Sequence, residues 1–178
     1  MGHMHLVLNH APVMGLFFSI ALMGYAFYIK ENHVKRAALW AYVMVGLVTV
    51  VSYLTGESAE EMMEHMPGVT KAMIEAHETA AIVAAILIIA TAILAAIELW
   101  NQKKGKPLNP KLMMGIIVLS VAAMLPIARA NYLGGLIGHP EIRPFGRANQ
   151  KEMPGFEAGE ESGESESENN GMPEPANH

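Results

Sequence analysis

Long apolar runs separated by short polar loops dominate the first 140 residues of the chain. A helix needs roughly 20 mainly apolar residues to cross the hydrocarbon core of a bilayer. On this criterion we predict four membrane-spanning helices, over residues 6–29, 37–54, 76–100 and 111–133. The pattern therefore predicts an all-α polytopic membrane protein, with an up-down bundle of four transmembrane helices over residues 1–143.

The first apolar run opens with His5-Leu-Val-Leu-Asn-His10-Ala-Pro12. A cleaved signal peptide normally has a basic segment before its apolar core and small residues at its cleavage site. No Lys or Arg precedes Leu6, and the run is long enough to span the bilayer. We therefore expect this segment to be retained as the first helix.

The loops between the runs differ in charge. Lys and Arg concentrate after the first and third runs, at Lys30, Lys35, Arg36, Lys103, Lys104 and Lys106. The loop after the second run is rich in Glu, and we expect residues 59–66 and 69–75 to form short interfacial helices around the turn at Pro67-Gly68. Because Lys and Arg favour the cytoplasmic side, both termini are predicted to lie outside the cytoplasm.

Charge and composition change after residue 143. Residues 1–143 hold ten Lys and Arg against nine Glu, whereas residues 144–178 hold two against eight and contain few large apolar side chains. A segment of that composition cannot bury enough surface to offset its conformational entropy. We predict a disordered acidic tail over residues 144–178, and no basic patch that would bind nucleic acid.

Histidines suggest the chemistry of the bundle. His5 and His10 open the first helix, His77 opens the third and His139 follows the fourth, so the predicted topology gathers them at the outer face. Facing bundle helices can present two imidazoles to opposite sides of a porphyrin. The chain has no cysteine, which excludes covalent haem attachment and thiolate metal sites. We predict that His10 and His77 ligate a b-type haem, the alternative being hydrogen-bonded core histidines.

Other residues near this face leave alternatives open. Arg129, the one arginine inside a predicted span, is expected either to pair with a haem propionate or to snorkel to the interface. His5 and His139 either form a second pair, hydrogen-bond an axial ligand or remain solvated. Thioether and imidazole ligands suit copper, but methionines also suit an amphipathic interfacial helix. The residues concerned are Met62, His65 and Met66.

Three motifs in this order resemble an uncharacterised bacterial family of four-helix inner-membrane proteins, described as haem- or redox-associated. The motifs are His5-x4-His10-x-Pro12, His77 at the head of the third span, and Gly134-Gly135-x3-His139 after the fourth. The resemblance covers about residues 5–140 and implies a bacterial inner-membrane location. It also implies that His5, His10, His77 and His139 are the shared polar positions.

Together these features predict a cytochrome b-like electron-transfer protein with one haem near the outer face, acting with a redox partner or within a larger membrane complex. One haem at one face cannot carry an electron across the bilayer, and Glu98 is an isolated carboxylate in an otherwise apolar inner half. We expect a non-catalytic subunit. The alternatives are an assembly subunit that holds copper or zinc at the outer histidines, and a structural scaffold.

Overall fold

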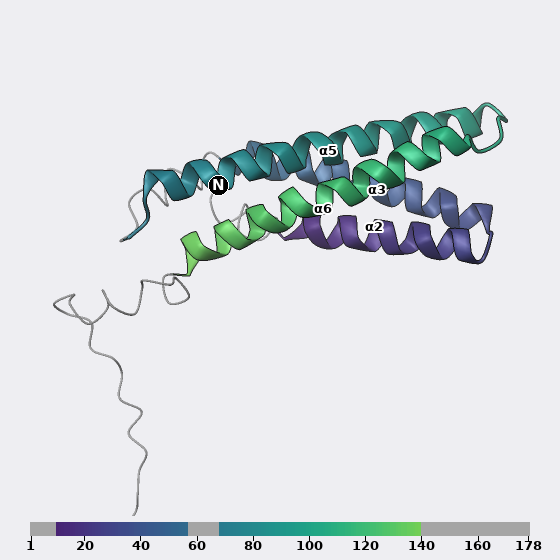
Figure 1. Cartoon of the computed structure of the whole chain (residues 1–178). Helices are drawn as coiled ribbons and strands as arrows, with labels where there is room; N and C mark the ends of the chain where they lie inside the picture. Colours follow the sequence, from purple (N-terminus) through teal and green to yellow (C-terminus); the bar gives the residue numbers. More distant parts are fainter. Residues whose placement is uncertain (1–9, 57–67, 140–178) are drawn as a thin grey trace, which may run out of the picture. The chain divides into compact units, whose positions relative to one another are not determined.

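The computed structural model describes residues 10–56 and 68–139, and these residues form helices and turns without a strand. The described part contains four helices, α2 (Ala11–Tyr28), α3 (Asn32–Leu54), α5 (Lys71–Lys103) and α6 (Pro110–Gly138) (Figure 1). Each is long and apolar enough to cross a membrane. The prediction of an all-helical protein with four potential spans is confirmed, while the predicted tail at 144–178 lies outside the described residues.

Side-chain caps set where two of the helices begin. The Thr70 side chain accepts a hydrogen bond from the Met73 backbone N–H at the start of α5. At the start of α6, the Asn109 side chain accepts from the Lys111 N–H at 3.0 Å, and Pro110 occupies the first turn. Such caps satisfy N–H groups that have no partner within the helix, and proline fits the first turn because its missing N–H is not needed there.

Three helices are longer than the sequence predicted, and α3 begins at Asn32 where a start at 37 was expected. The third span was placed at 76–100, but α5 begins at Lys71, so residues 71–75 belong to it and do not form a separate interfacial helix. The fourth was ended at 133, but α6 continues through Gly134 and Gly135. Glycine weakens a helix by about 1 kcal/mol relative to alanine. Burial of Ile137, which is 1% exposed, supports this last turn.

The helices pack as a four-helix bundle. The α5–α6 interface is the largest, followed by those of α3 with α5 and α2 with α3, and the α2–α6 interface is much smaller. Figure 1 shows α5 and α6 side by side along much of their length. Since α2 and α5 share the same two neighbours, they lie diagonally across the bundle.

Small and polar side chains let α3 approach its neighbours at mid-bundle. A Cβ atom added at Gly46 of α3 would overlap the Ala92 side chain of α5, so glycine is required for this spacing. The Tyr42 hydroxyl donates to Ser120 Oγ at 3.2 Å, which ties α3 to α6 inside the bundle. Apolar side chains from all four helices fill the space around these contacts, including Leu16, Met23, Leu39, Ile88, Ile116 and Ala123.

The outward surface of the helices is apolar, and the two ends of the bundle differ. Large exposed side chains include Phe17, Phe18, Leu47, Ile86, Val118 and Leu125. Surfaces of this kind suit lipid, which supplies no water for backbone or polar groups. We call the end where α2 and α5 begin and α3 and α6 end the histidine end. The other, which carries the turns at residues 29–31 and 104–109, is the lysine end.

A buried carboxylate fixes the turn between α5 and α6 at the lysine end. Glu98 is fully buried, and its Oε1 accepts a hydrogen bond from the Asn109 N–H at 3.0 Å. Its Oε2 has no hydrogen-bond partner among the described residues. The sequence presented Glu98 as an isolated carboxylate, whereas the structure shows a tie between the end of α5 and the residue that caps α6.

Candidate functional site

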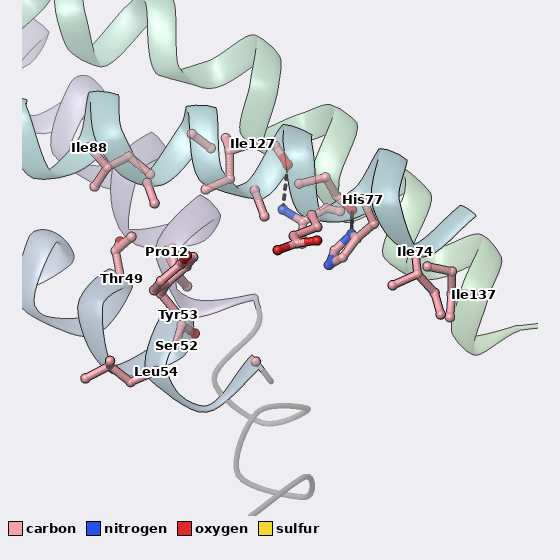
Figure 2. A pocket seen from close by; sticks show the side chains of 17 residues that line it. Pro12, Thr49, Ser52, Tyr53, Leu54, Ile74, His77, Ile88, Ile127 and Ile137 are labelled. Atoms are coloured by element: carbon pink, nitrogen blue, oxygen red, sulfur yellow. Dashed lines mark hydrogen bonds between the residues drawn. The ribbon is translucent and has the colours of Figure 1, made fainter. Parts of the chain in front are cut away.

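A pocket of about 420 Å³ opens at the histidine end and is lined by residues of all four helices. Most of its lining is apolar or small, including Ala81, Ala84, Ala85, Ile88, Ile127 and Ile137. Figure 2 shows His77 between Ile127 and Ile74, with Pro12 and Tyr53 lining the same pocket. A concave, mainly apolar pocket with few polar groups is typical of a ligand or cofactor site.

His77 is the imidazole that lines this pocket. It lies in the second turn of α5, is half-buried, and places Nδ1 2.8 Å from the backbone oxygen of Ala130 in α6 (Figure 2). A carbonyl oxygen only accepts hydrogen bonds, so Nδ1 must carry the proton. In the neutral ring, the lone pair of Nε2 is then available for a metal, in the arrangement usual for ligating histidines.

His10 is held in the same way by the next residue of α6. It immediately precedes α2, is exposed, and places Nδ1 3.2 Å from Asn131 Oδ1. Asn131 Nδ2 donates to the Ile127 carbonyl at 2.9 Å, which identifies Oδ1 as the acceptor facing His10. Nδ1 of His10 is therefore the donor, and Nε2 keeps its lone pair.

The structure thus brings His10 and His77 to consecutive positions of one helix. Ala130 and Asn131 anchor the two rings, although His10 comes from α2 and His77 from the diagonal helix α5. Asn131 lines the pocket, so the exposed His10 ring lies beside it. Within residues 10–56 and 68–139, no group of three or more His, Cys, Asp or Glu forms a metal site. Two imidazoles are the set that a haem iron takes.

The remaining predicted site residues are placed differently. Arg129 is exposed on α6 and immediately precedes Ala130, and the part of the pocket lining that is described does not include it. His139 is exposed at the end of α6, where its backbone N–H donates to the Gly135 carbonyl at 2.9 Å. His5 and the proposed copper ligands lie outside the described residues, the latter being Met62, His65 and Met66.

Sequence reasoning missed the two anchors on α6. Asn131 is an amide inside an apolar span, a signal that could have suggested a polar partner. The Ala130 carbonyl carries no such signal, because every residue has one and only the packing of α5 on α6 selects it. Glu78 was also missed: it follows His77, lines the pocket and remains exposed, so it adds a carboxylate at the mouth.

Comparison of the chain with protein-family models, with curated proteins and with solved structures finds no match. The resemblance to a bacterial inner-membrane family therefore stays a prediction. Function is therefore inferred from the pocket, from His77 in its lining and from His10, which Asn131 holds.

Proposed function

We propose that this chain is a multi-pass protein of the bacterial inner membrane that binds one b-type haem at the histidine end and transfers electrons. The proposed arrangement is an up-down bundle with both termini outside the cytoplasm. The protein acts with a redox partner or in a larger membrane complex, and catalyses no reaction of its own.

One observation carries the proposal: both imidazoles are fixed through Nδ1 to adjacent residues of α6. Ala130 O holds His77 and Asn131 Oδ1 holds His10, so each ring keeps Nε2 for a ligand. Hydrogen bonds of this kind set the tautomer, orient the ring and raise its basicity toward a metal.

The residues present fit a haem. The pocket volume of about 420 Å³ lies within the range of cofactor sites, and its alanine and isoleucine lining suits a flat apolar ring. His77 lines the pocket from α5, and His10 at the start of α2 contacts Asn131, which also lines it. When bound, a haem supplies a one-electron iron couple.

The residues around the pocket would then influence the reduction potential of the iron. Apolar walls from α5 and α6 exclude water from one side of the pocket, and low polarity around an iron centre influences its potential. Hydrogen bonds to Nδ1 strengthen each imidazole as a ligand. With the pocket at one end of the bundle, electrons enter and leave on the same side of the membrane.

Absorption spectroscopy of the purified full chain, produced with haem supplied, tests the proposal. We expect a Soret band in the wild type, its loss in His77→Ala, and its loss or a marked shift in His10→Ala. His33→Ala is the matched control, because His33 lies at the lysine end and its removal should leave the band unchanged. Absence of the band in the wild type, or its survival in both site variants, overturns the proposal.

Metal analysis of the same sample separates the proposal from its main rival. Iron in equal amount to porphyrin supports haem binding. Copper or zinc without porphyrin, retained by the wild type and lost in His77→Ala, would instead indicate a metal-holding assembly subunit.

A further inference from the structure

A second pocket, of about 260 Å³, lies at the lysine end between the start of α3 and the α5–α6 turn. Polar and cationic side chains supply most of its lining, namely Asn32, His33, Arg36, Gln102 and Lys106. The described residues that line it include no Asp or Glu. The pocket is therefore a concave site with excess positive charge, remote from the imidazoles of the histidine end.

Arg36 is positioned in this pocket by a hydrogen bond. Its Nε donates to Gln102 Oε1 at 3.0 Å, which links α3 to the last turn of α5. The guanidinium carries five N–H donors in a rigid fork, and this contact uses the one on Nε. The donors on the two terminal nitrogens form the edge that suits two oxygens of a carboxylate or phosphate.

The amide of Gln102, which holds Arg36, has a nitrogen without a partner in the described part of the chain. Its Nε2 is buried and has no hydrogen-bond partner among the described residues. A buried donor without an acceptor is costly, of the order of 1–3 kcal/mol. Because Nε2 is buried, an anionic oxygen in the pocket would meet the exposed Arg36 fork first and would reach this N–H only if the Gln102 side chain turned.

The side chains around the pocket are typical of the membrane–water interface, where lipid phosphates lie. The Nζ atoms of Lys103 and Lys104 lie over the Trp100 ring, 5.8 and 5.2 Å from its centre. Tyr28 is 84% exposed at the same end. Exposed Trp and Tyr are typical of the membrane–water interface. Basic pockets between transmembrane helices at this depth bind anionic headgroups.

We propose that this lysine-end pocket binds a phosphate group through Arg36 and Lys106, with Gln102 holding Arg36 in place. The phosphodiester of an anionic phospholipid and free inorganic phosphate share this chemistry. The site is independent of the proposed haem site, since the two pockets share no lining residue.

The test compares both sources on the full chain purified in a neutral detergent. Native mass spectrometry measures retention of added phosphatidylglycerol, and thermal unfolding measures stabilisation by inorganic phosphate against chloride at equal ionic strength. We expect one ligand or the other to bind. Retention of lipid with no phosphate effect identifies the headgroup as the ligand, and the reverse identifies the free anion.

Variants decide whether binding uses the pocket. Arg36→Gln should weaken binding by about tenfold or more, since it removes paired charge-assisted hydrogen bonds as well as a charge. Lys106→Gln should weaken it by about threefold to fivefold and, being an exposed change, should preserve the fold. Lys104→Gln is the control: it removes the same charge outside the pocket, and we expect less than about a twofold change because exposed charges are screened.

Two results overturn the proposal. In one, neither phosphatidylglycerol nor inorganic phosphate binds the wild type. In the other, Lys104→Gln weakens binding as much as Lys106→Gln and Arg36→Gln, which would show general attraction to a basic surface.

Discussion

The two ends of the bundle use the same helices for opposite chemistry. At the histidine end, all four helices line an apolar pocket that contains His77, and Asn131 of the same lining holds the nearby ring of His10. At the lysine end, the start of α3, the end of α5 and the turn that follows it form a cationic pocket around Arg36 and Gln102. The first suits a flat apolar cofactor, and the second suits a small anion.

Helices α5 and α6 therefore have a positioning role in addition to their membrane-spanning length. The two helices share the largest interface in the bundle, so their packing against each other holds both of their ends in place. Ala130 and Asn131 position imidazoles at one end, while Asn109 binds the buried Glu98 at the other. Preorganised polar groups on rigid elements are what a binding site needs.

The largest effect is expected when α3 and α5 are forced apart at mid-bundle. Gly46→Leu forces a side chain into Ala92, where even a Cβ atom overlaps, and overpacking of this kind costs about 3 kcal/mol. We expect both binding sites to be lost together, so that the variant shows no Soret band and no stabilisation by phosphate. Circular dichroism during SDS titration measures the loss of stability.

Gly24→Leu is the control for this variant. Nothing lies within 4 Å of a Cβ placed at Gly24, which is exposed on α2. Its stability should equal or exceed that of the wild type. Equal stability of Gly46→Leu and Gly24→Leu would show that the approach of α3 to α5 does not hold the bundle together.

A change at Glu98 should affect the lysine end first. Glu98→Ala removes the acceptor of the Asn109 N–H and leaves a void, so we expect a loss of about 2 kcal/mol in SDS titration. Glu98→Gln retains an Oε1 acceptor and should lose much less. If the two variants are equally unstable, the charge of Glu98 matters more than its bond to Asn109.

Loss of one side-chain amide should affect only the end of the bundle at which it lies. Asn131→Leu removes the acceptor that orients His10 but leaves the Ala130 carbonyl on His77, so haem affinity should fall by about tenfold while binding persists. Gln102→Leu, a matched amide loss at the lysine end, should leave the haem titration unchanged and weaken phosphate binding. An equal effect of both variants on haem would mean that they act through general stability.

The four helices could be predicted from sequence because apolar length alone selects them. The ends at Tyr28 and Leu54 and the start at Pro110 agree with the sequence to within one residue. The start of α5 and the last turn of α6 could not be predicted, since the first depends on the Thr70 cap and the second on the packing of Ile137. His10 and His77 were expected to come together at one face, and the structure brings both to one turn of α6. That the contact uses Ala130 and Asn131 could not be predicted, because those residues are 53 and 121 positions away along the chain.

The smallest effect is expected midway between the ends, at the bond from Tyr42 to Ser120. The pair is buried in the bundle at 3.2 Å, and hydrogen bonds between membrane helices contribute about 0.6 kcal/mol on average. Tyr42→Phe should therefore lower stability by about this amount in SDS titration, and Ser120→Ala by a similar amount. The double variant should cost less than the sum of the two, because both changes remove the same bond. Since the pair belongs to neither pocket, haem and phosphate binding should stay at wild-type values. A change in either would show that α3 and α6 transmit strain from mid-bundle to that end.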